Sequence, residues 1–247
     1  MVDMHLDSGT VHIWWADLAD SRPDLAGLLD TTERQRHAAF LRPQDRARFA
    51  LGCTLVKLSA AAYLDREPAE IALDRGCTTC GRPHGKPRIP GTELEVSVSH
   101  SGARIGVAAH WGAPVGLDVE EVAGWRGGPP LWSVLAPAEA ALLRPLPVSE
   151  QPAVFLRYWV RKEAVVKMTG DGLLVDLATV VVGTPAEPAA VQAWPGRPDL
   201  AGQLSLHDLV SVPGYPAALA IGRPERVAIR ELDARQLLDS APPHRDK

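Results

Sequence analysis

The stretch "LEVSVSHSGARIGVAAHWGAPVGLDVE", Leu94 to Glu120, decides the fold class of this chain. Leu94, Val96 and Val98 alternate with polar residues, which is the period of a strand with one covered face. After the turn "SG", the runs "RIGVAAH" and "PVGLDVE" predict a second and a third strand by the same test. We therefore predict a β-meander over residues 94–120.

Helical patterns lie on both sides of this meander. The run "LRPQDRARFALGCTLVKLSAAAYLDREP" predicts a helix that begins near Pro43 and ends before Pro68, and its apolar later part predicts burial between layers. Helical spacing returns over residues 137–143 and 152–168. Short β-like runs follow, around Val180, Leu204, Ala218 and Val227. The order of a long helix followed by a meander thus occurs twice, which suggests an internal duplication.

From the composition we expect a soluble, cytoplasmic globular protein. The chain has 247 residues and 46% hydrophobic content, enough for a substantial core. A net charge of -4 without a run of Lys and Arg argues against a nucleic-acid partner. The N-terminal segment is acidic where a signal peptide is basic, and no run approaches the length of a membrane span. Three cysteines are too few for a secreted disulfide framework.

Two carboxylates close the predicted meander. Asp118 and Glu120 are two positions apart, so on a strand they project from the same face. Paired carboxylates suit Mg²⁺, which commonly takes one or two protein carboxylates together with substrate phosphates. The alternative is a solvated strand end, and the D-x-E pattern alone does not decide between the two.

The turn "SVSHSG", residues 97–102, gathers hydroxyls, an imidazole and turn amides in one corner. Such donors can bind phosphate oxygens, although a turn whose Ser and His satisfy local backbone groups is the simpler interpretation. A serine hydrolase is excluded by the lack of a G-x-S-x-G elbow.

The helical run "YWVRKEAVVKMTGDGL" carries the next candidate group. Glu163 and Lys167 lie one turn apart on a shared helix face, and Lys162 precedes them. Glu163 could serve as a metal ligand or a base. An ordinary ion pair on a solvated helix face explains the same spacing.

Two basic stretches precede the meander. "RPHGKPRI" places basic side chains on a Gly/Pro-rich loop whose backbone can approach a ligand closely, and "QDRARFALG" places Arg46 and Arg48 at the start of the first long helix. "CTTCGRPH" resembles half of a zinc knuckle, with Cys77, Cys80 and His84. No second C-x2-C completes it, and a closed tetrahedral site needs four ligands.

The ordered set "HGKP", "VSVSHSG", "VGLDVE" and "WVRKEAVVK" resembles the 4′-phosphopantetheinyl transferases of the surfactin-synthetase-activating (Sfp) type. The resemblance covers roughly Thr31 to Leu174. It implies an α/β (α+β) fold of two similar lobes, each with a helix packed on a mainly antiparallel sheet. The lobes would form an intramolecular pseudo-dimer with coenzyme A in the cleft between them. We expect an N-terminal lobe at 1–113, a C-terminal lobe at 114–238 and a disordered tail at 239–247.

The resemblance also implies the reaction and its residues. Members transfer the 4′-phosphopantetheine arm of coenzyme A to a serine of an acyl or peptidyl carrier protein, with Mg²⁺, and release 3′,5′-ADP. The implied metal ligands are Asp118, Glu120 and Glu163. The implied catalytic residues are Glu163, as base directly or through water, and Lys167, which neutralises the leaving diphosphate. The implied coenzyme A contacts are Arg48, Arg82, His84, Lys86, Pro87, Ser99, His100, Lys162 and Lys167.

Several points stay open at this stage. Many relatives have Asn where this chain has Ser97, and the role of the further acid Glu139 is unclear. A Mg²⁺-dependent coenzyme A pyrophosphohydrolase and a non-catalytic coenzyme A binding protein are the alternative functions. Carriers of polyketide, peptide and fatty-acid synthases all remain possible partners, and we expect a monomer. "GWRGGPPLWSVL", with Trp125, Arg126, Leu131 and Trp132, is a candidate docking segment for the carrier, and the alternative is that both tryptophans pack into the core.

Overall fold

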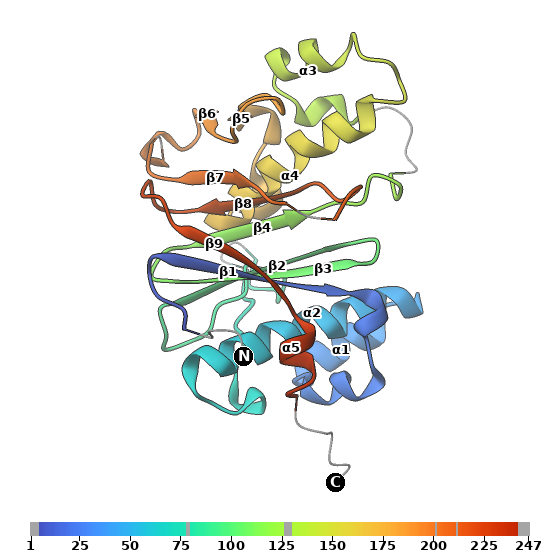
Figure 1. Ribbon diagram of the computed structural model, residues 1–247, viewed down its shortest axis with the longest axis vertical. Helices are drawn as coiled ribbons and strands as arrows, with labels where there is room; N and C mark the ends of the chain where they lie inside the picture. The colour runs from blue at the N-terminus through green and yellow to red at the C-terminus, as the bar shows by residue number, and fades with distance from the viewer. Residues whose placement is uncertain (1–4, 78–79, 126–129, 201, 211, 242–247) are drawn as a thin grey trace. The chain divides into compact units, whose positions relative to one another are not determined.

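The computed structural model describes residues 5–77, 80–125, 130–200, 202–210 and 212–241. The chain divides into two compact units (Figure 1). Unit 1 comprises Met1–Gly112 and Val227–Lys247, and unit 2 comprises Ala113–Arg226. The expected assignment of residues 227–238 to the second lobe is therefore wrong. Of the expected disordered tail, 242–247 lie outside the described residues, whereas Ala241 packs against the core of unit 1.

Unit 1 is built on a four-stranded sheet of order β2-β3-β1-β9. Its strands are β1 (Thr10–Asp17), β2 (Leu94–Ser101), β3 (Arg104–Trp111) and β9 (Ala228–Asp233). β3 pairs antiparallel with β1 and β2, and β9 pairs parallel with β1. This parallel pairing is the physical reason that the C-terminal segment belongs to unit 1, because β9 forms its strand hydrogen bonds with β1.

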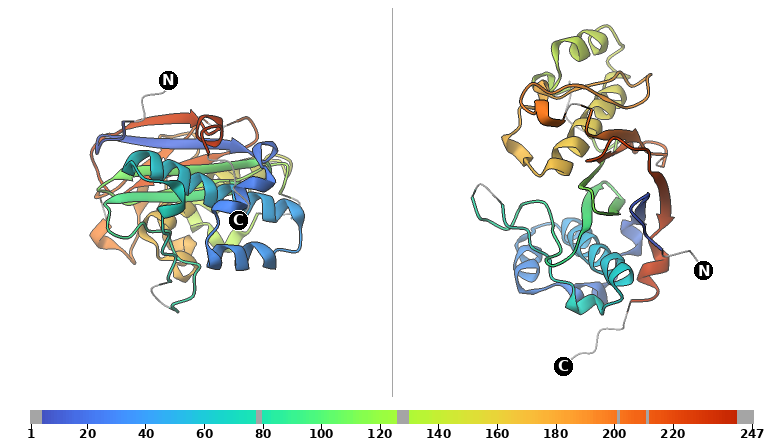
Figure 2. Two further views of the ribbon diagram at one scale, coloured as in Figure 1. Left: turned by 90° about the horizontal axis from the view of Figure 1, so that it is seen from below. Right: turned by 90° about the vertical axis from the view of Figure 1, so that its left-hand side faces the viewer.

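The long helix α2 (Pro43–Leu64) confirms the strongest helix prediction and packs on β2 and β3 (Figure 2). Pro43 stands in its first turn, and Asp65 ends it in a left-handed conformation. The remaining helices of unit 1 are α1 (Thr31–Ala39), α5 (Arg235–Leu238) and the 3-10 turns η1 (Leu18–Asp20), η2 (Pro23–Leu28) and η3 (Pro68–Glu70). Within the described residues, only α2 has the length and mean hydropathy of a membrane span. In its most apolar 18-residue stretch, 72% is buried inside the protein. This is therefore weak evidence for a membrane span, because a buried core helix passes the same test.

Unit 2 contains a three-stranded antiparallel sheet of order β4-β8-β7. The strands are β4 (Val115–Val119), β7 (Ser205–Asp208) and β8 (Ala217–Ile221), and a separate two-stranded ribbon joins β5 (Val181–Val182) to β6 (Val191–Ala193). The helices are α3 (Pro137–Leu143), α4 (Gln151–Thr169), η4 (Trp132–Val134), η5 (Gly172–Leu174), η6 (Leu177–Thr179) and η7 (Pro198–Leu200). α3 and α4 match the two predicted helices.

The predicted three-stranded meander ends after its second strand. β2 and β3 form the expected antiparallel hairpin, but β4 pairs with β8 in the other sheet. Gly112 turns the chain with a φ of 78°, which favours glycine, and Pro114 follows it. All five residues of β4 are buried, so this strand is covered on both faces instead of continuing a half-exposed meander. β4 is therefore the first strand of unit 2.

The two units share one topology. Unit 1 runs β1-α1-α2-β2-β3 with sheet order β2-β3-β1, and unit 2 runs β4-α3-α4-β7-β8 with sheet order β7-β8-β4. The predicted α+β class, with a helix on a mainly antiparallel sheet in each lobe, is confirmed. The repeat begins one strand earlier than the sequence pattern suggests, because β1 and β4 precede the helices. The arrangement of the lobes as a pseudo-dimer stays a prediction.

Candidate functional site

Helix α4 lies directly on strand β4 at Gly116. A Cβ built on Gly116 would stand 2.0 Å from the carbonyl oxygen of Ala164 and 2.3 Å from the amide nitrogen of Met168. Since real Cβ atoms do not approach backbone atoms this closely, only glycine fits. This close approach brings the end of β4 and the last turns of α4 together, and both carry charged side chains.

Asp118, Glu163 and Lys167 form a charged cluster at this contact. Lys167 Nζ lies 2.6 Å from Asp118 Oδ1, and Asp118 is almost fully buried at 3% exposure. Burial of Glu163 and the charges of Asp118 and Glu120 raise the pKa of the Glu163 carboxyl, while Lys167 opposes the shift. The structure thus brings together all four residues predicted for the metal and catalytic roles, from β4, its C-terminal end and α4.

The chemistry of this donor set fits a divalent cation. When ionised, three carboxylates beside one ammonium leave an excess negative charge in a largely buried place, and burial together with this repulsion raises the pKa of Glu163. Hard carboxylate oxygens of this kind are the ligands that Mg²⁺ takes together with phosphate. Asp118, Glu120 and Glu163 are therefore the residues that could hold the predicted metal.

Lys162 lies apart from this cluster. It is fully buried, and its Nζ lies 2.7 Å from Glu139 Oε2 and donates to the Leu177 carbonyl at 2.9 Å. Burial lowers the pKa of Lys162, and Glu139 opposes that shift. Glu139 also accepts from the Ala136 and Val182 amides. This placement gives Glu139 and Lys162 a structural role that holds α3 on α4, and Lys162 is not carried forward as a coenzyme A contact.

In unit 1, the predicted coenzyme A contacts lie on three elements. Arg48, in the first part of α2, donates to the Gly102 carbonyl at the tip of the β2-β3 hairpin and forms an ion pair with Asp45 at 2.7 Å. On β2, Ser99 is buried and His100 is exposed. Ser97 is buried too, so the face of β2 that the sequence pattern marks as polar is covered at both serines.

The "HGKP" segment lies on a loop before β2. Lys86 Nζ reaches Glu95 on β2 at 2.7 Å, and Pro87 is buried. Burial lowers the pKa of Lys86, and the contact with Glu95 opposes the shift. Arg82 and His84 are exposed, and both are hydrogen-bonded to Cys80. The loop therefore separates into a part anchored on the sheet and a part grouped around a thiol.

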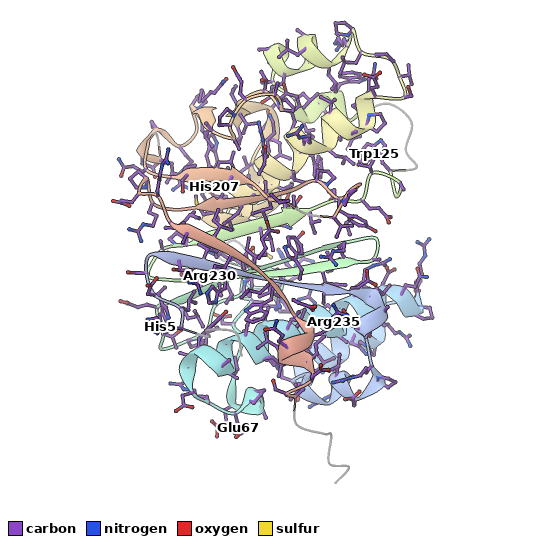
Figure 3. The ribbon with its side chains drawn as sticks, in the orientation of Figure 1. His5, Glu67, Trp125, His207, Arg230 and Arg235 are labelled. Atoms are coloured by element: carbon purple, nitrogen blue, oxygen red, sulfur yellow. The ribbon has the colours of Figure 1, made fainter. Side chains whose placement is uncertain are left out.

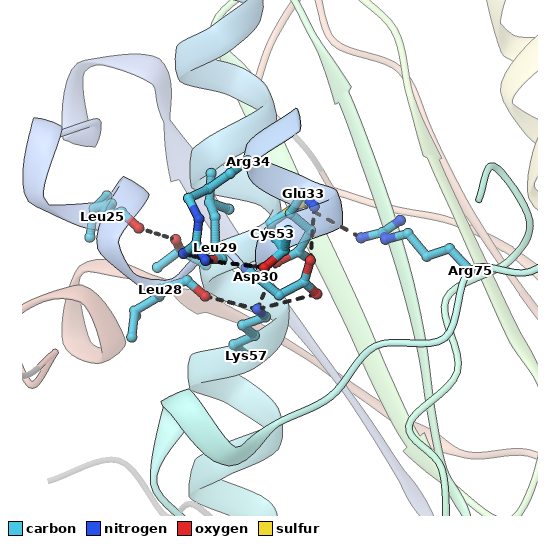
Figure 4. A network of polar contacts seen from close by, with 11 residues as sticks. Leu25, Leu28, Leu29, Asp30, Glu33, Arg34, Cys53, Lys57 and Arg75 are labelled. Atoms are coloured by element: carbon cyan, nitrogen blue, oxygen red, sulfur yellow. Dashed lines mark hydrogen bonds and ion pairs between the residues drawn. The ribbon is translucent and has the colours of Figure 1, made fainter. Parts of the chain in front are cut away.

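Sequence reasoning missed a buried ion pair in unit 1. Lys57 on α2 lies 2.7 Å from Glu33 on α1, and both side chains are buried (Figure 4). Glu33 also closes a capping box with Asp30 at the start of α1. The pattern "DTTE", an N-cap acid followed three residues later by Glu, is the signal that could have found this capping box.

The candidate docking segment follows β4. Trp125 (Figure 3) packs against Phe155 with ring centroids 5.1 Å apart, so it belongs to the packing of unit 2. Leu131 is 49% exposed. Arg126 lies outside the described residues. Trp132 also packs against the core of unit 2, so among Trp125, Leu131 and Trp132 it is Leu131 that is left available to a partner.

Comparisons with known proteins identify relatives of this chain. A model of the 4'-phosphopantetheinyl transferase superfamily matches residues 114–220, which include β4 and α4. The 4'-phosphopantetheinyl transferase HetI of Nostoc sp. is 31% identical over 226 residues, covering 89% of this chain and 90% of HetI. A phosphopantetheinyl transferase of Thraustochytrium sp. is 29% identical over 171 residues, covering 64% of this chain and 58% of that protein.

Among solved structures, the "ACPS-CoA complex" of Chronobacterium ammoniagenes is 21% identical and covers 46% of this chain and 98% of that chain, with a TM-score of 0.35. That likeness is too weak to define the fold. The Sfp subtype stays a prediction. The match to HetI extends over nearly the whole of both proteins, and on this ground the chain belongs to the 4′-phosphopantetheinyl transferase superfamily and is a transferase.

Proposed function

We propose that this enzyme transfers the 4′-phosphopantetheine arm of coenzyme A to a serine of an acyl or peptidyl carrier protein. The serine oxygen forms a bond to the phosphorus that carries the pantetheine arm, the P–O bond within the pyrophosphate breaks, and 3′,5′-ADP leaves. The observation that carries the proposal is the cluster of Asp118, Glu163 and Lys167 at the contact of β4 and α4, in a chain of this superfamily.

Glu163 is the proposed base for the serine proton. A base must be able to accept a hydroxyl proton as the new bond forms, and Glu163 is a carboxylate on α4 beside Asp118 and Lys167. Transfer at phosphorus needs alignment and charge neutralisation more than covalent help from the protein. The side chain of Lys167 is 31% exposed. It can supply a positive charge to the departing phosphate when it exchanges its contact with Asp118 for one with that phosphate.

Asp118, Glu120 and Glu163 are the proposed ligands of Mg²⁺. When bound, the metal would supply charge neutralisation for the phosphate oxygens. Among the side chains of this cluster, the positive charge comes from Lys167, which pairs with Asp118. The implied coenzyme A contacts of unit 1 that we retain are Arg48, Arg82, His84, Lys86, Pro87, Ser99 and His100.

The test incubates the protein with coenzyme A, Mg²⁺ and a panel of apo carrier proteins from polyketide, peptide and fatty-acid synthases, and weighs each carrier by intact mass spectrometry. We expect at least one carrier to gain one phosphopantetheine, with one 3′,5′-ADP formed per carrier modified. Coenzyme A cleavage without carrier modification would identify a pyrophosphohydrolase. Binding of coenzyme A with neither product would identify a non-catalytic binding protein. Either result would contradict the proposal.

A further inference from the structure

The loop before β2 folds back on itself as an irregular hairpin. Asp74 and Arg88 exchange backbone hydrogen bonds of 2.9 and 2.8 Å, which form an antiparallel bridge. Further along, the Gly85 amide donates to the Arg75 carbonyl at 2.7 Å and the Cys77 amide to the Arg82 carbonyl at 2.9 Å. A Cβ on Gly85 would stand 2.8 Å from the Gly76 carbonyl oxygen, so the two arms lie close together. This backbone frame fixes where the side chains at the tip of the loop meet.

Two thiols and one imidazole meet at that tip. The ligand atoms of Cys77, Cys80 and His84 all lie within 4.8 Å of one another, and over the described residues no other group of three His, Cys, Asp or Glu is as compact. His84 Nε2 lies 3.0 Å from Cys80 Sγ. The chain after Cys80 turns at Gly81, whose φ is 70° and whose amide donates to the Cys77 carbonyl at 2.8 Å. The two arms thus bring a sequence-local pair of cysteines and a later histidine to one point.

The chemistry of these three groups is that of a zinc ligand set. Thiolate sulfur and imidazole nitrogen are the preferred ligands of Zn²⁺, and three protein ligands leave one coordination position for water. A metal ion can reach these side chains without any change in the core, because Cys77 is partly exposed and Cys80 and His84 are exposed.

We propose that Cys77, Cys80 and His84 bind one Zn²⁺ at the tip of this loop, through two sulfurs and Nε2, with the fourth position open to solvent. The sequence alone argued against zinc because a fourth protein ligand was not visible. The structure changes that argument, because it closes the loop so that His84 joins the cysteine pair and an open three-ligand site needs no fourth residue.

The site has a consequence for the adjoining "HGKP" segment, which rests on the proposed function. A zinc-bound His84 ring could no longer contact coenzyme A directly, so His84 would leave the set of coenzyme A contacts retained above. Lys86, two residues later, remains fixed on β2 through Glu95. The metal would therefore order the outer half of the loop, and Lys86 rather than His84 would contact the coenzyme.

The test measures metal binding alone, without coenzyme A or carrier, so it does not depend on the transferase reaction. Reduced, chelator-treated protein is titrated with Zn²⁺ and, separately, with Co²⁺, and metal content is determined by mass spectrometry after desalting. We expect one zinc per chain and, with Co²⁺, a thiolate-to-cobalt charge-transfer band. Ions bound at Asp118, Glu120 and Glu163 would give no such band, because it requires a sulfur ligand.

Matched variants identify the ligands. Cys80→Ser and His84→Ala should each weaken Zn²⁺ binding by at least about 100-fold, a loss no smaller than that of an outer-shell partner. Cys53→Ala removes the third thiol, which is buried and outside the cluster, and should leave both the stoichiometry and the cobalt band unchanged. Limited proteolysis of the loop should also slow when Zn²⁺ is added to the wild-type protein but not to Cys80→Ser.

Three results would overturn the inference. The first is a reduced wild-type protein that binds no zinc above the level of Cys80→Ser. The second is a cobalt complex without the sulfur band. The third is a Cys77–Cys80 disulfide that forms in air, is found by mass spectrometry, and persists in the presence of excess Zn²⁺, since that would assign the pair to redox chemistry.

Discussion

In unit 1, Lys57 of the long helix α2 forms an ion pair with Glu33 of the short helix α1, and in unit 2, Lys162 of α4 forms one with Glu139 of α3. Both pairs are buried, and both measure 2.7 Å. Each glutamate also caps the start of its own short helix, and each lysine also donates to a backbone carbonyl. In each unit, a buried Lys–Glu ion pair of the same kind therefore attaches the short helix to the long helix.

The residues beside the buried ion pair differ between the units. One position after the buried lysine, unit 1 has Leu58 and unit 2 has Glu163; five positions after it, unit 1 has Ala62 and unit 2 has Lys167. On the first strand, Ala16 pairs with the second residue of β3, whereas Asp118 pairs with the second residue of β8. The charged cluster thus replaces residues that unit 1 keeps apolar. Both units contain the buried pair, and unit 2 also carries the charged cluster on which the proposed chemistry rests.

The largest expected effect concerns the glycine that each unit places between helix and sheet. Gly116→Ala in unit 2 directs a Cβ into the backbone of α4 at 2.0 Å, so we expect it to destabilise the protein by more than about 5 kcal/mol or to prevent folding. Gly52→Ala in unit 1 meets side-chain methyls alone, of Val98 at 3.3 Å and of Ile105 at 3.9 Å, and gains helix propensity, so its effect should stay within about 1 kcal/mol. Chemical denaturation of both variants measures the difference.

Equal stability of the two alanine variants would contradict the expected difference between the units. It would mean that α4 can move away from β4 as easily as the Val98 side chain can move away from α2. Retained activity in a folded Gly116→Ala variant would further show that the approach of α4 to β4 does not position Asp118 and Lys167.

The second prediction concerns the buried ion pairs. Lys57→Met and Lys162→Met should each cost about 3–5 kcal/mol of unfolding free energy, because removal of one partner leaves a buried glutamate uncompensated. At a temperature where the variant is folded, Lys162→Met should keep the wild-type KM for coenzyme A. A large rise of that KM in Lys162→Met, without one in Lys57→Met, would assign Lys162 to ligand binding and contradict its structural role.

These pairs show where prediction from the sequence ends. Long helices and the β2-β3 hairpin follow from local periodicity, so α2, α3 and α4 were predicted closely. β1 has six consecutive buried residues and no alternation, and β9 joins it across more than two hundred positions of sequence, so neither pairing leaves a local signal. β4 was assigned to the wrong sheet for the same reason: strand partners are chosen by tertiary packing.

The candidate site divides in a similar way. Asp118, Glu120, Glu163 and Lys167 were predicted from a motif resemblance, and they meet in the structure. The spacing of Glu163 and Lys167 equally fitted an ion pair on a helix face, yet Lys167 reaches across to Asp118 on β4. Lys162, one position before Glu163, faces the core instead, which adjacency in the motif could not reveal.

The third prediction concerns the added charge of unit 2. Glu163→Gln should lower kcat for carrier modification by about 100-fold, the scale of a lost general base. Its melting temperature should stay equal or rise, because folding raises the pKa of Glu163 and so disfavours its ionised form at neutral pH. Glu150→Gln, at an exposed position just before α4, is the matched control and should leave kcat unchanged. A Glu163→Gln variant with wild-type kcat would exclude the base role.

The smallest expected effect concerns the segment between the first strand and the short helix, which the two units use differently. In unit 1 this segment is folded inward, with Leu25 only 2% exposed, whereas in unit 2 it leaves Leu131 49% exposed directly after the strand that carries Asp118. Leu131→Ala should raise the apparent KM for the carrier by about three- to tenfold, as truncation of one apolar interface residue does, with kcat, KM for coenzyme A and melting temperature unchanged. Leu25→Ala should do the opposite, with a loss of about 2–5 kcal/mol of stability and no change in carrier KM. A lowered melting temperature of Leu131→Ala with an unchanged carrier KM would mean that both segments only pack their own unit. A raised carrier KM with an unchanged melting temperature would show that this segment can contact the carrier in unit 2, whereas in unit 1 it packs into the core.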